Sequence, residues 1–487
     1  MTATTTLIAQ LESVVGPNSV FHQPSDLIVY EYDGSVEGAV DLARPVAVVL
    51  PRTTSEVAAI VRIAKLAGLP VVPRGAGTGL SGGAVAQTGG VIIALTRMDK
   101  ILEVDYDNEV ATVEPGVINL ELSDFTGTQG YFFAPDPSSQ RACTIGGNVA
   151  ENSGGPHCLK YGVTTNHILG LEFVTADGDI HWIGGDRPGQ AGYDLTAAIV
   201  GSEGMLGIVT KALVRLTPAP QQVSVILAAF ADIETASAVV TEVISAGIVP
   251  AALEMMDALT IQAVEPAFHA GYPMDAGAVL LIEIDGRPED VAETQTEIEA
   301  ICRQAEAMIV RTATSKAERD LLWKGRKMAI AAMGRLAPNY YLHDTVVPRT
   351  RLPETMRQVY QIAADFDLPI ANMFHAGDGN LHPLMLFDRH NQSQVQRVLE
   401  ASKELITYCV SIGGALTGEH GIGTEKRDYM TLVFNEQDLA AMAGVKQTFD
   451  PAAMFNPGKL FPRGYVCGEV RALRLQEMAQ KHGIYPL

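Results

Sequence analysis

The sequence predicts an α+β protein that contains more than one domain. Its 487 residues correspond to about three domains of ordinary size. Hydrophobic residues make up 47% and charged residues 19% of the chain, which is typical of folded proteins and excludes extended disorder. The pattern of elements also changes along the chain, from a glycine-rich βαβ arrangement to a β-α-β-β-α-β arrangement.

The first domain is predicted over residues 42–219, after an N-terminal segment of residues 1–41. The run PVAVVLP predicts a strand, Thr54, Ser55 and Glu56 offer a cap for a helix that Gly68 ends, and LPVVPRG resumes a strand. Residues 75–90 contain too much glycine for a regular element, whereas 89–95 and 101–113 have strand-like content. Turns are predicted from Ala134 to Gly162, and the linker TPAP ends the domain.

The second domain is predicted over residues 220–462, before a tail at 463–487. Strands at 223–230, 251–256, 278–285 and 307–313 alternate with helices at 233–245 and 289–305, the order of a ferredoxin-like layer. Further on, we expect a strand near Leu342, a helix after Pro353, strands at 371–375 and 381–387, and a helix at 393–411. The two sections are expected to form one substrate-side unit.

The charge and the cysteines restrict the partners and the compartment. Thirty-five Lys+Arg against 56 Asp+Glu leave a net charge of −21, so nucleic acid is not an expected partner. Five scattered cysteines without a C-x-x-C pair indicate a reducing, cytoplasmic location. No signal peptide, spanning helix or direct membrane insertion is expected, so attachment to a membrane would require a partner.

Three glycine-rich segments indicate a ligand that approaches the backbone closely. Gly77, Gly79 and Gly82 spell G-x-G-x-x-G, but the helix precedes this loop, whereas a Rossmann loop opens a helix. Successive backbone N–H groups could instead cradle a pyrophosphate, or the loop could be an ordinary turn. Similar segments lie at 135–162 and 201–210, a coincidence that turns alone explain poorly.

Two histidines flank a turn in FHAGDGNLHP. If residues 377–380 form the tip of a hairpin, His375 and His382 face each other across paired strands and could share a cation. Glu419, in the glycine-flanked TGEHG, could supply a third ligand. From the spacing alone, an ordinary hairpin with polar turn residues is an equally good interpretation.

Two further side chains are candidates for catalysis. His420 adjoins Glu419, and a neutral imidazole beside a cation can remove a hydroxyl proton, although a structural loop histidine has the same pattern. Arg326, in WKGRK, could hold a substrate carboxylate through its guanidinium, although it could equally be an exposed residue on a helix surface.

The motifs PVVPRGAGTGLSGG, PDPSSQRACTIGGNVAENSGG, GSEGMLGIVT, HAGDGNLHP, GEHGIGTEK and NPGK resemble those of FAD-linked oxidases of the vanillyl-alcohol oxidase/p-cresol methylhydroxylase type. Within that superfamily the chain resembles the branch of glycolate oxidase flavoprotein subunits and D-lactate and D-2-hydroxyglutarate dehydrogenases. The resemblance implies a two-subdomain FAD-binding domain followed by a ferredoxin-like α+β substrate domain.

The resemblance implies that FAD lies along the glycine-rich loops. Because the first loop offers Thr78 and no histidine, we expect the FAD to be non-covalent. The cofactor-binding residues implied in this way are Arg74, Gly75, Ala76, Gly77, Thr78, Gly79, Leu80, Pro135, Asp136, Pro137, Ser138, Cys143, Gly146, Gly147, Asn148, Asn152, Gly154, Gly155, Glu203, Gly204, Gly207, Ile208, Val209 and Asn456.

The resemblance also implies a reaction. A divalent zinc or manganese ion on His375, His382 and Glu419 would bind glycolate or another small D-2-hydroxy acid, Arg326 would hold its carboxylate, and His420 would take the hydroxyl proton while hydride passes to FAD. The alternatives are D-lactate dehydrogenase linked to a cytochrome or quinone, and D-2-hydroxyglutarate dehydrogenase. Apolar Leu342 favours a small substrate.

The reduced flavin needs an external acceptor, because the sequence has no haem, iron–sulfur or nicotinamide motif. The resemblance implies companion flavin-related and iron–sulfur subunits, through which the protein could lie peripheral to an inner membrane. Two other classes remain open. A metallohydrolase could use the same three ligands, and an assembly subunit could hold FAD without turnover.

Overall fold

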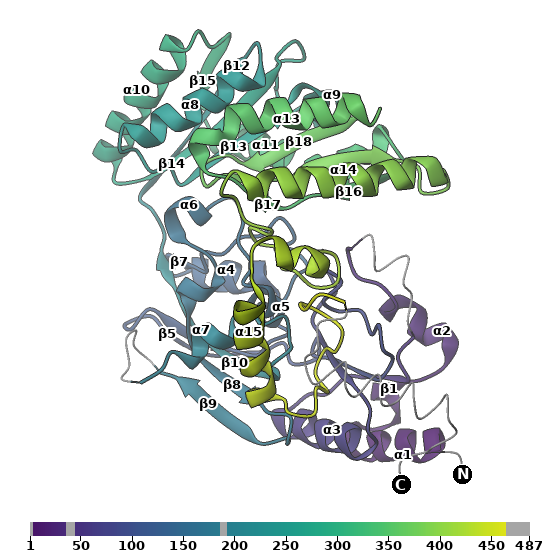
Figure 1. The fold of residues 1–487 in the computed structure, drawn as a ribbon. Helices are drawn as coiled ribbons and strands as arrows, with labels where there is room; N and C mark the ends of the chain where they lie inside the picture. The colour runs from purple at the N-terminus through teal and green to yellow at the C-terminus, as the bar shows by residue number, and fades with distance from the viewer. Residues whose placement is uncertain (1–2, 36–43, 186–191, 464–487) are drawn as a thin grey trace. The chain divides into compact units, whose positions relative to one another are not determined.

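The computed structural model describes residues 3–35, 44–185 and 192–463 and separates into two compact units (Figure 1). The first unit comprises the residues up to 153, residues 163–218 and the residues from 419 onward, and the second comprises Gly154–Gly162 and Ala219–Gly418. The predicted domains with boundaries at 219/220 and 462/463 divide the chain differently, because they place residues 419–462 with the substrate domain. Apart from Arg463, the predicted tail lies outside the described residues.

The first subdomain of the first unit contains the predicted βαβ arrangement. Its four-stranded sheet has the order β1-β2-β4-β3, and both β2 and β3 run parallel to β4, which lies between them. The helix α3 is capped by Thr53, whose side chain accepts from Glu56 N at 3.2 Å, one residue before the predicted cap. The elements are α1 (Ala3–Val15), β1 (Val20–Phe21), α2 (Pro24–Leu27), β2 (Ala47–Val49), α3 (Thr54–Leu66), β3 (Val71–Arg74) and β4 (Val91–Ala94).

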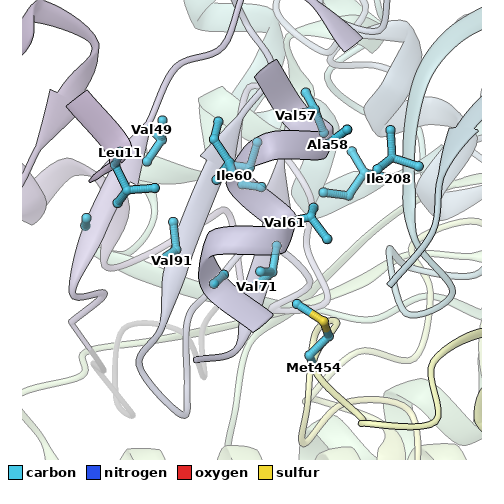
Figure 2. Packing of buried hydrophobic residues seen from close by; sticks show 14 of the residues in the cluster. Leu11, Val49, Val57, Ala58, Ile60, Val61, Val71, Val91, Ile208 and Met454 are labelled. Atoms are coloured by element: carbon cyan, nitrogen blue, oxygen red, sulfur yellow. The ribbon is translucent and has the colours of Figure 1, made fainter. Parts of the chain in front are cut away.

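The C-terminal part of the chain completes the core of this subdomain. Val71 N donates to Met454 O at 2.8 Å and Asn456 N donates to Val71 O at 2.9 Å, so residues 454–456 extend the edge at β3. Met454 belongs to the same buried cluster as Ile60 and Val91 (Figure 2). This backbone pairing and apolar packing explain why the residues after 419 belong to the first unit.

The second subdomain of the first unit is built on a five-stranded antiparallel sheet with the order β5-β6-β10-β8-β9. The turn-rich segment expected at 134–162 contains two short helices, α5 and α6. Thr144 caps α5 by accepting from Gly147 N at 3.2 Å. The elements are β5 (Ile101–Asp105), β6 (Val110–Val113), α4 (Asn119–Gly127), β7 (Tyr131–Phe132), α5 (Ile145–Glu151), β8 (Ile168–Val174), β9 (Ile180–Gly184), α7 (Leu195–Ile199), β10 (Ile208–Arg215), β11 (Thr217–Pro218) and α15 (Glu436–Phe449), with α6 (Cys158–Tyr161) in the second unit.

The second unit contains the predicted β-α-β-β-α-β order. Its sheet begins β15-β12-β14-β13, with the first and third strands of the motif in the middle, and its pairs are antiparallel. The helix α9, which contains Pro266, was not predicted; Asp257 caps it by accepting from Thr260 N at 2.9 Å. The elements are β12 (Gln222–Phe230), α8 (Ile233–Ser245), β13 (Ala252–Asp257), α9 (Ala258–Phe268), β14 (Ala278–Gly286), α10 (Pro288–Gln304) and β15 (Ile309–Thr312).

The same sheet continues into the later part of the predicted second domain, because β18 pairs with β13. The two sections therefore share one sheet and one apolar core up to Gly418. The remaining elements are α11 (Lys316–Lys327), α12 (Ala329–Ala332), β16 (Asn339–Leu342), β17 (Thr345–Val346), α13 (Leu352–Asp365), β18 (Ile370–His375), β19 (Asn380–Leu381), β20 (Pro383–Phe387) and α14 (Gln392–Ser411). Among the helices in the described part of the chain, none is long and apolar enough to cross a membrane.

Candidate active site

The first glycine-rich loop follows β3 and is followed by no helix, as the sequence predicted. Gly77 has φ +73°, and a Cβ atom added there would lie 2.2 Å from a terminal nitrogen of Arg74. The buried Arg74 guanidinium donates to Tyr32 O at 2.9 Å and Ala84 O at 3.3 Å, and burial lowers its pKa. Arg74 therefore folds back under its own loop and fixes the loop's conformation.

The backbone of this loop is suited to an anion. Within the residues that the structure describes, no protein group accepts a hydrogen bond from the backbone N–H groups of Gly75 to Leu80. An added Cβ at Gly79 would meet only Glu151 Oε1, at 3.9 Å, so the space above this glycine is open. A run of available N–H groups beside open space is what a pyrophosphate requires, and the loop therefore fits the predicted cofactor.

The second glycine-rich segment contacts the first through α5. A Cβ atom at Gly75 would lie 2.5 Å from Thr144 Oγ1, and one at Gly146 would lie 2.6 Å from Pro115 Cβ. The Asn119 side chain donates to Pro135 O at 2.9 Å, and its N–H donates to Cys143 O at 3.0 Å. These contacts hold the segment close to β3 and leave no room for larger residues at the two glycines.

The third segment is bonded to α5 near the C-terminal end of this helix. Glu203 N donates to Ala150 O and Gly201 N donates to Val149 O, both at 2.8 Å. A Cβ atom at Gly204 would lie 2.5 Å from Pro73 Cγ, and one at Gly207 would lie 2.3 Å from the Phe173 ring. The structure thus brings the predicted cofactor residues of the three segments together in the first unit, apart from Gly154 and Gly155, which belong to the second unit.

Both the nitrogen and the oxygen of the Asn456 side-chain amide form hydrogen bonds within the protein. Its Nδ2 donates to Gly83 O at 3.0 Å and Glu203 O at 2.6 Å, and its Oδ1 accepts from Lys459 Nζ at 2.7 Å. Lys459 also donates to Gly83 O at 2.5 Å, and burial lowers its pKa to about 7. Asn456 therefore links the C-terminal segment to the glycine-rich loops, and its predicted contact with FAD stays a prediction.

Beside Lys459 lies a carboxyl group that the sequence did not single out. Glu151 ends α5, and burial, with the neighbouring charge of Glu203, raises its pKa well above the ordinary value. The two glutamates surround Gly421, where an added Cβ would lie 2.4 Å from Glu151 Oε2 and 3.0 Å from Glu203 Oε1. The segment that carries His420 is therefore fixed against the predicted cofactor loops of the same unit. His420 Nε2 lies 4.0 Å from Glu419 Oε1.

The two histidines of the hairpin meet, but not through the predicted pairing. His375 is directly opposite Asn380, and Gly379 has φ +82° in the tight turn between them. The expectation of directly opposed histidines was wrong because the four-residue turn comprises residues 376–379, one residue earlier than the predicted 377–380. His382 lies two residues beyond Asn380 and so points to the same face of the sheet. The two rings lie 5.1 Å apart between centroids, with planes at 90°.

Both histidines are oriented by a hydrogen bond at Nδ1. His375 Nδ1 lies 2.7 and 2.9 Å from the Glu254 carboxylate oxygens, and His382 Nδ1 lies 3.1 Å from His343 O. Such partners direct Nε2 of a histidine toward a cation, and ring nitrogens of the two lie within 4.8 Å of each other. The pair fits a metal ion as two of its ligands.

Glu254 also binds the predicted substrate clamp. Arg326 Nη2 lies 2.6 Å from Glu254 Oε2, and the two side chains are 4% and 0% exposed. Burial acts to raise the pKa of Glu254, but His375 and Arg326 outweigh it, and the pKa falls below the ordinary value. The interpretation of Arg326 as an exposed surface residue is thereby excluded. Its Nε is buried and has no acceptor in the described part of the chain.

Two carboxylates of the second unit, those of Glu254 and Asp344, were not predicted from the sequence. Glu254 lies on β13 within the apolar run AALEMM, and an acid at a buried strand position is the signal that could have identified it. Asp344 accepts from Gly418 N at 3.0 Å and from the Thr417 hydroxyl, and one of its oxygens lies within 4.8 Å of a ring nitrogen of His382. Glu419 follows Gly418 directly in the chain.

Comparison with known proteins decides the family. The family described as "FAD linked oxidases, C-terminal domain" matches residues 219–460, and the FAD binding domain family matches residues 45–184. The chain is 43% identical over 483 residues to the glycolate oxidase subunit GlcD of Escherichia coli K12, covering 99% of this chain and 95% of that protein. This chain belongs to the FAD-linked oxidase family.

Two other similarities agree with this assignment. The chain is 33% identical to a D-lactate dehydrogenase of Anaerostipes hadrus over 86% of this chain and 90% of that protein. It also matches a crystal structure of p-cresol methylhydroxylase, with a TM-score of 0.79 and 18% identity over 95% of this chain and 98% of that one. The predicted resemblance and fold class are confirmed, and FAD is the cofactor. The metallohydrolase and the non-catalytic assembly subunit are no longer supported.

We expect Gly77 to be required for the binding of FAD. We expect Gly77→Ala to lower the FAD content of the purified protein, because the added Cβ displaces Arg74 and so deforms the loop. The measurement is the ratio of flavin to protein absorbance. Gly130→Ala is the control, since Gly130 has a similar φ of +79° but open space around its Cβ position. Equal FAD loss in both variants would show that backbone strain alone is responsible.

Proposed function

We propose that this protein oxidises glycolate, or another small D-2-hydroxy acid, to the 2-oxo acid and passes the electrons from FAD to an external acceptor. The similarity to GlcD over nearly the whole chain supports this proposal. D-lactate dehydrogenation is the related alternative, supported by the second relative. D-2-hydroxyglutarate remains an alternative, because Leu342 packs against the apolar core and does not by itself decide the size of the substrate.

The observation that carries the proposal is the buried guanidinium of Arg326. A buried N–H without an acceptor costs free energy, and Nε is such a group. A substrate carboxylate would supply the missing acceptor, and in a protein with a net charge of −21 an anionic substrate needs a local cation such as this guanidinium. Glu254 binds the guanidinium through Nη2 and so orients Arg326. The N–H of Nε remains available to donate to the substrate.

His375, His382 and Glu419 are the residues that we propose as ligands of a divalent zinc or manganese ion. The hydrogen bonds at both Nδ1 atoms support the two histidines as ligands, and Gly418, bonded to Asp344, holds the backbone one residue before Glu419. When bound, FAD supplies the hydride acceptor and the metal supplies a Lewis acid. His420 takes the hydroxyl proton, and Arg326 fixes the carboxylate so that the α-hydrogen is directed toward the flavin.

The FAD is non-covalent in this proposal, since the first glycine-rich loop has Thr78 and no histidine. We also propose that companion subunits, one flavin-related and one containing iron–sulfur clusters, take the electrons onward. The word "subunit" in the name of the E. coli relative supports an assembly of this kind.

The substrate class is tested with an anaerobic visible spectrum of the FAD-loaded protein. We expect glycolate or D-lactate to bleach the flavin absorbance, because either acid can deliver its α-hydride without an acceptor present. The faster of the two identifies the better substrate, and D-2-hydroxyglutarate and L-lactate are run beside them. A flavin that none of the D-acids bleaches would overturn the proposed function while leaving the family unchanged.

The role of Arg326 is tested with Arg326→Lys. An ammonium cannot donate simultaneously to Glu254 and to a carboxylate in the guanidinium geometry, so we expect KM for the hydroxy acid to rise about 10–100-fold, the cost of losing a charged hydrogen bond. Steady-state kinetics with an artificial electron acceptor provide the measurement. Lys327→Met removes the adjacent cation as a control, and a KM that changes equally in both variants would contradict the assignment.

The metal is tested by chelation of the FAD-loaded protein. We expect turnover to fall with FAD content unchanged and to return when Zn²⁺ or Mn²⁺ is added, with metal content followed by mass spectrometry. Glu254→Gln should lower metal affinity about 10–100-fold, as loss of a hydrogen-bonded partner of a ligating histidine does. Asp257→Asn removes another buried carboxylate of β13 as the control. Full activity in metal-free protein would refute this part of the proposal.

A further inference from the structure

Glu203 has a backbone conformation that suits glycine better than glutamate. Its φ is +52°, in the left-handed region, and it stands within the glycine-rich third segment next to Gly204, whose φ is +67°. A residue with a Cβ atom is strained in this region, whereas glycine is not. The side chain of Glu203 is also buried, with the residue 4% exposed. A role for the carboxylate would explain a glutamate at this position.

The carboxylate binds two successive backbone groups of the loop that carries His420. Oε1 accepts from Ile422 N and Oε2 accepts from Gly423 N, each at 2.7 Å. Ile422 and Gly423 are the second and third residues after His420 in the chain. Both carboxylate oxygens are therefore engaged with the protein, and each bond is a charge-assisted hydrogen bond of short length.

The same loop is also bonded to the first glycine-rich segment and to the C-terminal segment. Thr424 N donates to Ser81 O and Leu460 N donates to Gly423 O, both at 2.8 Å. An added Cβ at Gly423 would lie 2.0 Å from Ser81 O, so the loop is packed tightly against this segment. All these contacts lie within the first unit, and they leave residues 421–424 little freedom to move.

We propose that Glu203 is a positioning residue for His420, and that it acts through the backbone of residues 422–423 and not as a ligand of FAD through its carboxylate. The inference rests on the proposed function, because the role of His420 as the base is itself part of that proposal. Glu203 belongs to a cofactor loop and its backbone is bonded to α5 and Asn456. Through it, the loop that binds FAD also sets the position of the base.

The test compares Glu203→Gly with Glu203→Gln. Glycine relieves the backbone strain and removes both acceptors, whereas glutamine keeps one acceptor and places an NH₂ group against the other N–H. We expect kcat to fall about 10–100-fold in Glu203→Gly, the scale of a misplaced catalytic group, and less in Glu203→Gln, with FAD content and KM little changed. If the backbone conformation alone matters, Glu203→Gly is at least as active as the wild type, and the inference is wrong.

Hydrogen exchange supplies a readout that does not depend on turnover. We expect the amides of Ile422 and Gly423 to exchange faster in both variants of the FAD-loaded protein, followed by mass spectrometry on peptides that span residues 417–426. If Glu203→Gly does not fold, Glu203→Gln decides the question by the same two measurements. Unchanged exchange at these amides would overturn the inference even if activity falls.

Two controls separate this inference from the proposed function. Glu114→Gln alters another buried glutamate of the first unit, whose Oε2 accepts from Lys100 N at 2.9 Å, and it should leave kcat and the exchange of residues 422–423 unchanged. His420→Ala should abolish most of the turnover with FAD retained. If His420→Ala is fully active, the proposed function fails. If it is inactive while Glu203→Gly keeps wild-type kcat, only the role of Glu203 fails.

Discussion

The carboxylate of Glu254 is fully buried, and the substrate side of the protein depends on how that charge is compensated. A buried carboxylate is tolerated only with charged or hydrogen-bonding partners, and Glu254 has both in His375 and Arg326. One acidic side chain on β13 therefore orients a predicted metal ligand from β18 and the predicted carboxylate clamp from α11. Removing it would leave a buried guanidinium uncompensated and one imidazole without the partner that fixes its orientation.

In the first unit, a few polar side chains hold the glycine-rich loops together. A flat, phosphorylated cofactor requires close approach of the backbone, which would explain why the predicted cofactor loops are rich in glycine. Polar side chains from distant parts of the chain supply the missing connections: Asn456 and Lys459 bind the first loop at Gly83, and Asn456 also binds the third at Glu203. The C-terminal segment is thus a structural part of the cofactor unit, although the chain reaches it only after completing the second unit.

The sequence predicted the parts of this protein that depend on local patterns. The strands and helices of the ferredoxin-like layer follow from periodicity, and the glycine-rich loops with their motifs identified the family. It did not predict that residues 419–463 return to the first unit, because the pairing of Val71 with Phe455 joins residues far apart in the chain. It also placed the hairpin register two residues away, since the composition of this segment cannot distinguish a four-residue turn at 376–379 from one at 377–380. Glu254 was missed because an isolated acid in an apolar strand has no local signature of its partners.

The histidine pair of the second unit and the glycine-rich loops of the first unit could have been unrelated features of a large protein. Two arrangements argue for one reaction. Within the second unit, His375 shares Glu254 with the buried guanidinium of Arg326, and a substrate carboxylate would supply the acceptor that the Nε of this guanidinium lacks. Within the first unit, the loop that follows His420 is bonded to Glu203 and Ser81, which belong to the cofactor segments. The proposed base is fixed to the predicted cofactor loops, and the proposed carboxylate clamp is fixed through Glu254 to a proposed metal ligand. Oxidation of a hydroxy acid would use both groups, because the proton and the hydride leave adjacent atoms of one molecule and must be received in a defined geometry.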